Sequence, residues 1–143
     1  KLIINHRLLN SIINFLSHKP VFGTCAGLIL LSTDIKDGNN ILSFKCLDIK
    51  VERNAWGRQI SSFKTSLNLK LNDKDKISYD AIFIRAPKII TCNEKTKILS
   101  TLNNSPVMVR NKGVLATTFH PELTDDMRIH EYFLKMVKEH ASC

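Results

Sequence analysis

The sequence of 143 residues lacks the features on which several classes of protein depend. Its four cysteines, Cys25, Cys46, Cys92 and Cys143, form no Cys-x-x-Cys pair, so a zinc site has little support. No apolar run approaches the roughly 20 residues that a membrane-spanning helix needs. The single tryptophan, Trp56, stands apart from the lysines, and no basic run is interleaved with aromatic residues. These absences argue against a metal-binding, a membrane or a nucleic-acid-binding protein.

The overall composition predicts one cytoplasmic domain covering residues 1–143. Hydrophobic residues make up 43% of the chain and charged residues 24%, which is ordinary for a globular domain. The opening segment, KLIINHRLLN, has neither the apolar region nor the cleavage site of a secretory signal. Because nothing suggests secretion, the cysteines are interpreted as free thiols in a reducing compartment. The net charge of +8 is interpreted as a solvated, lysine-rich surface that could steer an acidic protein partner.

Hydrophobic periodicity predicts an α/β fold with three layers. The expected elements are a helix at 5–18, a strand at 21–24, a helix at 27–35, strands at 45–53, 66–72 and 79–87, a strand pair around the turn at 111–113, and a helix with Thr124 as its N-cap. The run at 79–87 is continuously apolar, as expected of a central strand covered on both faces. This order predicts a mostly parallel central sheet flanked by helices, with an antiparallel insertion. A parallel sheet normally has a strand before its first helix, so we also expect N-terminal structure beyond this sequence.

The segment Gly-Thr-Cys-Ala-Gly places Cys25 between a predicted strand and a predicted helix. This arrangement is the sulfur version of the nucleophile elbow, in which Gly23 and Gly27 leave room for the close approach of strand and helix. A tight turn would project the sulfur from the sheet edge, and the helix N-terminus would favour the reactive thiolate. The backbone N–H of Ala26 is placed to donate to an oxyanion. The alternative is an inert cysteine buried in a core strand.

A thiol nucleophile needs a base, and His120 is the candidate among the five histidines. It follows an apolar strand, and the strand ends of open α/β sheets are where such folds place their sites. Glu122 lies two residues further on and would project to the same side, while Pro121 stiffens the link. The carboxylate could therefore reach the imidazole. The alternative is a strand-end histidine beside an unrelated surface carboxylate.

Together, the two motifs resemble those of the class I, or triad, glutamine amidotransferases. The stretches GTCAGLILLS, VERNAWGRQISSF, FIRAP and ATTFHPEL are similar to the glutaminase subunits of pyridoxal 5′-phosphate synthase, and these motifs run over residues 20–123. The resemblance implies that Cys25 is the nucleophile, His120 the general base and acid, and Glu122 the group that orients the histidine. It also implies that the N–H of Ala26 contributes to the oxyanion hole.

The same resemblance implies a substrate and a partner. The substrate is L-glutamine, which would be contacted by Arg53 and by the pair Ile84 and Arg85, since arginine is a natural bidentate partner of the α-carboxylate. Hydrolysis would give glutamate and ammonia without a metal or an organic cofactor. The ammonia would pass through a channel to a (β/α)₈-barrel synthase subunit, which uses it to make pyridoxal 5′-phosphate, a form of vitamin B6.

The sequence departs from the family pattern in one respect. The family has an N-terminal strand and a Gly-Gly-Glu-Ser loop that completes the oxyanion hole, whereas this sequence contains no Gly-Gly pair. We therefore expect an N-terminally truncated domain that carries the triad and half of the oxyanion hole. One alternative is another triad glutaminase, such as the imidazole glycerol phosphate synthase type, against which VERNAWGRQ and FIRAP argue. The other is a catalytically impaired remnant that only binds the synthase subunit.

Overall fold

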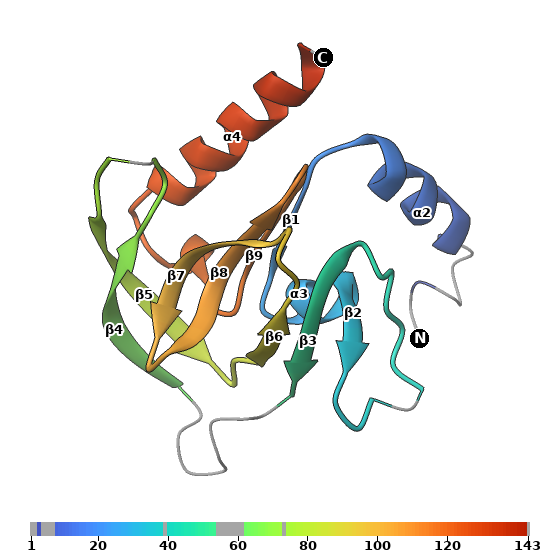
Figure 1. The fold of residues 1–143 in the computed structure, drawn as a ribbon, viewed down its shortest axis with the longest axis horizontal. Coiled ribbons are helices and arrows are strands. Elements are labelled where there is room, and N and C mark those ends of the chain that lie inside the picture. Colours follow the sequence, from blue (N-terminus) through green and yellow to red (C-terminus); the bar gives the residue numbers. More distant parts are fainter. Residues whose placement is uncertain (1–2, 4–7, 39, 54–61, 73, 143) are drawn as a thin grey trace.

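The computed structural model describes residues 3, 8–38, 40–53, 62–72 and 74–142. The helices are α2 (Leu9–His18), α3 (Ala26–Leu31), the short 3-10 helix η1 (Pro121–Leu123) and α4 (Arg128–Ala141). The strands are β1 (Val21–Thr24), β2 (Ser32–Ile35), β3 (Leu47–Glu52), β4 (Ser62–Leu69), β5 (Ile77–Ile84), β6 (Lys88–Cys92), β7 (Lys97–Leu102), β8 (Ser105–Asn111) and β9 (Val114–Thr117). Figure 1 shows these elements arranged around a central sheet.

The central sheet has the strand order β1-β9-β8-β7. β1 and β9 are parallel, with Thr24 opposite Thr117, whereas β9–β8 and β8–β7 are antiparallel. A three-stranded sheet, β2-β3-β6, and a two-stranded sheet, β4-β5, flank it (Figure 1). The expected α/β fold with flanking helices is confirmed, but the described central sheet is mixed rather than mostly parallel, since two of its three strand pairings are antiparallel. Within the described residues, parallel pairing is confined to β1–β9 and β2–β3.

Two apolar clusters cover the two faces of the central sheet. Neighbouring residues of a strand point to opposite faces, and accordingly Leu115 and Ala116 of β9 belong to different clusters. Leu115 packs with Ile129 of α4 and with the β4–β5 sheet, whereas Ala116 packs with Leu28 of α3 and with the β2-β3-β6 sheet. Each fully buried large side chain contributes about 1.5–3 kcal/mol to folding. The clusters therefore hold β1 and β9, the strands that precede Cys25 and His120, firmly between two layers.

Several sequence-based predictions are confirmed. β1 covers the predicted range 21–24, and β8 and β9 flank the predicted turn at 111–113. In β3, Leu47, Ile49 and Val51 are buried and alternate with more exposed residues, as the sequence pattern indicates. Helix α2 ends at His18, as predicted, while positions 5–7 of that predicted helix lie outside the described residues.

Two of the predicted strand and helix positions are wrong. The predicted helix at 27–35 ends at Leu31, because Ser32–Ile35 pairs in parallel with β3 as strand β2. The β-branched side chains within this segment favour a strand. The run at 79–87 does not form a central strand either, since β5 pairs with β4 in a two-stranded sheet. Burial along β5 alternates, so one face packs on the core and the other lies open.

The predicted N-cap of the last helix is also wrong. Helix α4 begins at Arg128, after Met127, and Thr124 instead ends the short helix η1. The hydroxyl of Thr124 is bonded to the phenol of Tyr79 and to the carbonyl of Pro121, so it is not available to cap α4. The apolar stripe predicted for this helix is present, since Ile129 and Met136 are buried, and Phe133 and Val137 are partly buried.

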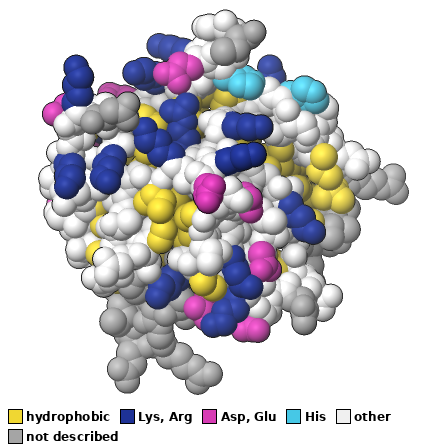
Figure 2. All heavy atoms as spheres, in the orientation of Figure 1, with side chains coloured by type: hydrophobic (Ala, Val, Ile, Leu, Met, Phe, Trp, Pro, Cys, Tyr) yellow, Lys and Arg dark blue, Asp and Glu magenta, His cyan; other side chains and the backbone are white. Residues whose placement is uncertain are grey.

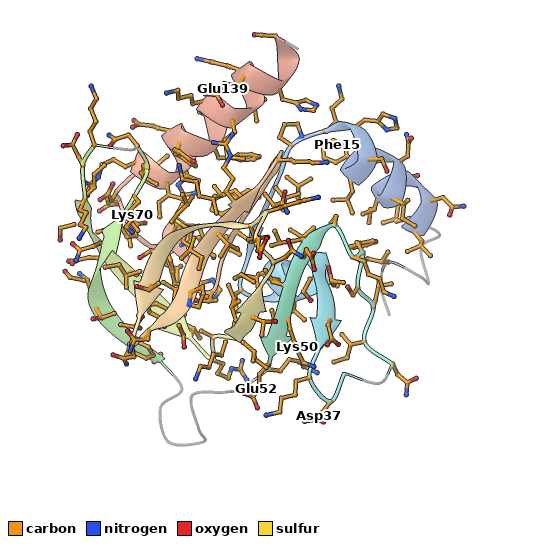
Figure 3. All side chains as sticks on the ribbon, in the orientation of Figure 1. Phe15, Asp37, Lys50, Glu52, Lys70 and Glu139 are labelled. Carbon is orange, nitrogen blue, oxygen red and sulfur yellow. The ribbon has the colours of Figure 1, made fainter. Side chains whose placement is uncertain are left out.

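Charged side chains of both signs share the visible face of the protein. On the face in Figure 2, Lys and Arg side chains are spread widely, and Asp and Glu side chains lie among them. Figure 3 shows two such charged residues, Lys50 and Glu52, on β3. They form ion pairs with Asp34 and Lys36, and exposed pairs of this kind contribute little to stability. Across the residues that the structure describes, no helix has the length and apolar character needed to cross a membrane.

The close contact of β1 with α3 leads to a prediction about the two glycines of the elbow. A Cβ atom at Gly23 would lie 2.5 Å from Cδ1 of Leu31 and 2.9 Å from the backbone carbon of Gly27, whereas a Cβ atom at Gly27 would meet nothing within 4 Å. Gly23→Ala should therefore lower the free energy of unfolding by about 1–3 kcal/mol. Gly27→Ala should be neutral or stabilise by up to about 1 kcal/mol, because alanine favours helix. Urea unfolding of both variants measures the difference, and equal values would contradict this packing.

Candidate active site

Cys25 occupies a strained turn at the carboxyl end of β1. Its backbone has φ 48° and ψ −103°, a left-handed conformation that side chains other than glycine rarely adopt. The N–H of Cys25 donates to the carbonyl of Thr117 at 2.8 Å, which extends the β1–β9 pairing by one residue. Gly23 allows α3 to fold back directly after the turn. The sequence prediction of a tight turn at this cysteine agrees with this geometry.

His120 and Glu122 lie just beyond the carboxyl end of the neighbouring strand β9. Nδ1 of His120 lies 2.6 Å from Oε1 of Glu122. An ionised carboxylate can only accept, so this contact places the imidazole proton on Nδ1. In the neutral ring, Nε2 is then the basic nitrogen. The 3-10 helix η1 (Pro121–Leu123) begins directly after His120 and contains Glu122, and this tight turn brings positions 120 and 122 to one side.

Strand β5 contacts both the cysteine and the histidine. The thiol of Cys25 donates to the carbonyl of Ile84 at 3.9 Å, and the backbone N–H of His120 donates to the carbonyl of Ile82 at 2.9 Å. Carbonyls two residues apart in a strand point the same way and are separated by about 7 Å. Cys25 and His120 therefore flank the same end of β5.

Burial makes the thiol of Cys25 harder to ionise than the sequence suggested. Desolvation is the largest influence and raises the pKa of Cys25 above its ordinary value, and the negative charge of Glu122 adds to this. The N–H of Ala26 and the positive charge of Arg85 act in the opposite direction without outweighing burial. The N–H at the start of α3 does favour the thiolate, as predicted from the sequence, but burial outweighs it and the pKa of Cys25 remains raised. Helix α3 has only six residues, so its dipole is small.

Ala26 supplies a backbone donor directly at the sulfur. It is the first residue of α3, and its N–H is the second-largest influence on the pKa of Cys25, which it lowers. An oxyanion formed on a carbon attached to the sulfur would lie beside this donor. The role of this N–H as an oxyanion donor stays a prediction.

The three predicted substrate-binding residues lie at the same edge of the molecule. Ile84 is 36% exposed, and Arg85 is exposed with φ 42°, a second strained residue close to the thiol. Arg53 is exposed and follows β3, whose last residue, Glu52, lies opposite Lys88 of β6. β6 begins three residues after Arg85, so the two arginines approach this edge from neighbouring strands. Six further residues of the VERNAWGRQ motif lie outside the described residues; they are Asn54, Ala55, Trp56, Gly57, Arg58 and Gln59.

No metal centre accompanies this arrangement within the described part of the chain. No group of three His, Cys, Asp or Glu side chains among those residues could hold a metal ion. The chemistry available at the site is therefore that of a thiol, an imidazole with a carboxylate partner, a backbone N–H and two guanidinium groups.

Sequence reasoning missed the contribution of β5 to the site. The carbonyls of Ile82 and Ile84 hold His120 and Cys25 through backbone contacts, for which side-chain identity gives no signal. It also missed Tyr79, whose phenol bonds to Thr124 in the segment after the histidine. A tyrosine at a buried position of the strand was the available clue, because a buried phenol normally has a hydrogen-bond partner.

Comparison with known proteins identifies a matching family and several similar proteins. The SNO glutamine amidotransferase family matches residues 1–139. The chain is 52% identical over 120 residues to the pyridoxal 5′-phosphate synthase subunit PdxT of Thermosipho africanus. This alignment covers 84% of this chain and 62% of that relative. It is 47% identical over 135 residues to PdxT of Francisella tularensis subsp. tularensis, which covers 94% of this chain and 69% of the relative. The chain thus spans less than two thirds of the Thermosipho protein.

A solved structure shares the fold. The crystal structure of a glutamine amidotransferase superimposes with a TM-score of 0.86 at 36% sequence identity. The match covers 96% of this chain and 71% of that chain. The arrangement of strands around Cys25 and His120 is therefore one that a glutamine amidotransferase also adopts.

The charges around Cys25 predict how its alkylation by iodoacetamide depends on pH. Only the thiolate reacts, and the pKa of Cys25 is raised, so the reaction should reach half its maximal rate above the pH typical of a free cysteine. Glu122→Gln removes a negative charge and should move this midpoint to lower pH. Arg85→Gln removes a positive charge and should move it to higher pH.

The same experiment contains its own control. Cys46 and Cys92 are partly buried, and burial is the leading cause of their raised pKa values, with no contribution from Glu122 or Arg85. Mass spectrometry of the alkylated peptides should therefore show unchanged midpoints for these two thiols in both variants. Preferential alkylation of Cys25 near pH 7 in the unaltered chain would contradict the burial argument.

Proposed function

This chain belongs to the SNO glutamine amidotransferase family, and on that premise we propose that it hydrolyses L-glutamine to L-glutamate and ammonia for pyridoxal 5′-phosphate synthesis. The observation that carries the proposal is the hydrogen bond between His120 and Glu122 beside a strained cysteine turn. A thiol, a base and a group that orients the base are the parts that nucleophilic amide hydrolysis requires. The similarity to PdxT proteins supports the choice of glutamine as the substrate and of vitamin B6 synthesis as the pathway.

The reaction begins with activation of the thiol. Because the pKa of Cys25 is raised, the resting sulfur carries its proton and donates weakly to Ile84. Nε2 of His120 takes this proton as the thiolate attacks the carbon of the glutamine side-chain amide. Glu122 holds the ring through Nδ1 and stabilises the imidazolium that forms. The raised pKa suits this coupled step, since the thiolate is generated only when an electrophile is in place.

The amide then breaks down in two stages. The tetrahedral oxyanion accepts a hydrogen bond from the N–H of Ala26 as that donor leaves the sulfur. The imidazolium of His120 protonates the amide nitrogen, so ammonia departs and a γ-glutamyl thioester remains on Cys25. A water molecule, deprotonated by the same imidazole, attacks the thioester and releases glutamate. The proton returns to the sulfur, and the site regains its starting state.

Binding of free glutamine requires a cation for its α-carboxylate. Arg85 is exposed beside the thiol, and Arg53 approaches the same edge from β3. Either guanidinium can bind a carboxylate through two parallel hydrogen bonds. Ile84 provides an exposed apolar surface against which the methylene groups of the substrate can pack.

The proposal includes a partner and a compartment. The curated relatives are named as subunits of pyridoxal 5′-phosphate synthase. A (β/α)₈-barrel synthase subunit would receive the ammonia through a channel, because ammonia that escapes into water is protonated and ceases to be a nucleophile. The described cysteines, Cys25, Cys46 and Cys92, are free, which fits a reducing compartment such as the cytoplasm.

Ammonia release in the presence of the synthase subunit tests the proposed function. The full chain should release glutamate and ammonia in equal amounts from L-glutamine. Cys25→Ala should reduce the rate to background, because removal of a nucleophile abolishes the covalent pathway. Cys46→Ala is the matched control, since it also removes a partly buried thiol, one that contacts the carbonyl of Leu31 at the opposite end of α3 from Cys25.

The outcome separates the alternatives. Release that persists in Cys25→Ala would overturn the role of the thiol. No release from the unaltered chain, together with tight binding to the synthase subunit, would favour the impaired remnant. Release that responds only to the acceptor subunit of imidazole glycerol phosphate synthase would favour that type of glutaminase.

A further inference from the structure

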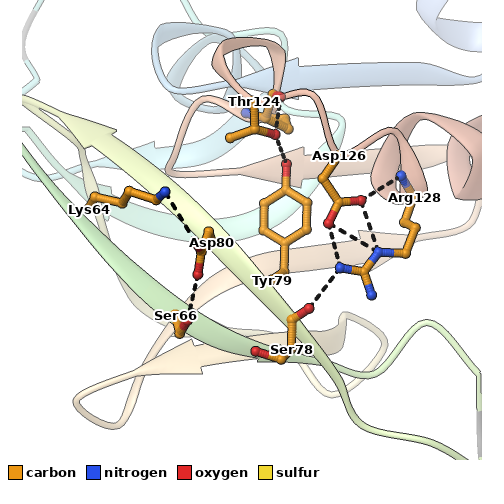
Figure 4. Close-up of polar contacts among 9 residues, drawn as sticks. Lys64, Ser66, Ser78, Tyr79, Asp80, Thr124, Asp126 and Arg128 are labelled. Carbon is orange, nitrogen blue, oxygen red and sulfur yellow. Dashed lines mark hydrogen bonds and ion pairs between the residues drawn. The ribbon is translucent and has the colours of Figure 1, made fainter.

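A hydroxyl relay connects β5 to the peptide that lies between the histidine and its carboxylate. The phenol of Tyr79 lies 2.8 Å from Oγ1 of Thr124, and Oγ1 of Thr124 lies 3.1 Å from the carbonyl of Pro121. A carbonyl can only accept, so the hydroxyl proton of Thr124 goes to Pro121 and the phenol proton of Tyr79 goes to Thr124. Pro121 stands directly between His120 and Glu122. Figure 4 shows the phenol of Tyr79 pointing at Thr124.

A second contact anchors the same segment to the same strand. Nη2 of Arg128 donates to the carbonyl of Ser78 at 2.8 Å, and Nε of Arg128 donates to both carboxylate oxygens of Asp126 at 2.9 and 3.1 Å (Figure 4). Residues 123–126 and 128 also line a cavity of about 460 Å³ against β4 and β5. The chain after Glu122 is therefore joined to β5 by the polar contacts of Thr124 and Arg128. Loss of one of these contacts would shift the position of this segment.

Tyr79 is suited to a fixed donor role. It is 1% exposed, and its ring packs against Phe119, the residue before His120, with centroids 6.0 Å apart. Burial and the negative charges of Asp126 and Glu122 raise the pKa of Tyr79, so the phenol keeps its proton at neutral pH. The influence of Glu122 on this phenol also indicates that the two groups lie within electrostatic reach.

We propose that Tyr79 and Thr124 are positioning residues of the glutaminase site, which fix the Pro121 peptide and thereby the contact of Glu122 with Nδ1 of His120. This inference rests on the proposed function for its catalytic consequence. Neither residue touches the substrate. Their relay sets the geometry of η1, and η1 sets the angle at which Glu122 meets the imidazole. Without the relay, the carbonyl of Pro121 would keep only the backbone N–H of Thr124 at 3.3 Å, and the contact of Glu122 with Nδ1 of His120 would lose part of its support.

Steady-state kinetics with the synthase subunit test the catalytic consequence. Tyr79→Phe keeps the ring and removes the donor, so kcat should fall about 10-fold to 100-fold through misplacement of the base. KM for glutamine should stay unchanged, since Arg53 and Arg85 are not involved. Thr124→Val should behave like Tyr79→Phe, and Thr124→Ser, which keeps the hydroxyl, should restore the rate. The double variant should be no worse than either single variant, because both break one relay.

A matched control removes a neighbouring hydrogen bond that does not reach η1. Ser66 on β4 donates to Asp80 of β5 at 2.6 Å, beside the ion pair of Asp80 with Lys64 (Figure 4). Ser66→Ala should leave kcat and KM unchanged. Urea unfolding of every variant separates a loss of positioning from a loss of stability. Thr124→Val alters only a partly buried turn, so it keeps the test available if Tyr79→Phe folds poorly.

An NMR measurement on the free chain makes the inference independent of glutaminase activity. The Nδ1 proton of a histidine exchanges quickly with water unless a hydrogen bond protects it. Its ¹H–¹⁵N signal, assigned with His120→Gln, should be visible in the unaltered chain, in Ser66→Ala and in Thr124→Ser. It should be broadened or lost in Tyr79→Phe and in Thr124→Val.

The two measurements distinguish the possible failures. A signal that persists in both Tyr79→Phe and Thr124→Val overturns the positioning role, whatever happens to kcat. A signal lost in these variants, in a chain that never hydrolyses glutamine, supports the positioning role and refutes the proposed function. An increase in KM with unchanged kcat would also overturn the inference, since it would place the effect on substrate binding.

Discussion

The site depends on the parallel pairing of β1 with β9. Thr24 lies opposite Thr117, and the N–H of Cys25 continues the ladder to the carbonyl of Thr117, so the two chains leave the sheet at the same level. Parallel strands end together, which is why residues far apart in the sequence meet at one edge. The two apolar clusters lock this pair of strands between layers. A shift of register by one residue would turn the side chains of β9 to the wrong faces and separate the candidate nucleophile from its base.

Strand β5 adds a second constraint, because its backbone and its buried face hold the residues of the site in place. Its carbonyls at Ile82 and Ile84 contact His120 and Cys25, and its phenol at Tyr79 reaches the turn beyond the histidine. A strand of the two-stranded sheet thus fixes the relative positions of the segments that follow β1 and β9 in the central sheet. The site is therefore assembled from three elements that belong to two different sheets.

The sequence contained the parts of the fold and site that local chemistry determines. Glycine flanking Cys25 predicted the tight turn, and the spacing of His120 and Glu122 predicted their common side. The parts that were missed depend on long-range packing. The apolar run at 79–87 did not reveal that β5 pairs only with β4 among the described strands. The raised pKa of Cys25 depends on burial, which the neighbouring residues in the sequence do not indicate. Threonine is a common N-cap residue, but the hydroxyl of Thr124 is hydrogen-bonded to the phenol of Tyr79, which is distant in the sequence.

The backbone of Cys25 has a consequence for how such a protein can evolve. A left-handed conformation at a residue with a Cβ atom is held by the surrounding layers at a cost of about 1–3 kcal/mol, and glycine would adopt it freely. A chain with glycine at position 25 would therefore be more stable, but it would lack the sulfur of the candidate nucleophile. Selection for stability alone would replace Cys25 by glycine. The presence of the thiol therefore indicates that some stability has been given up for chemical reactivity.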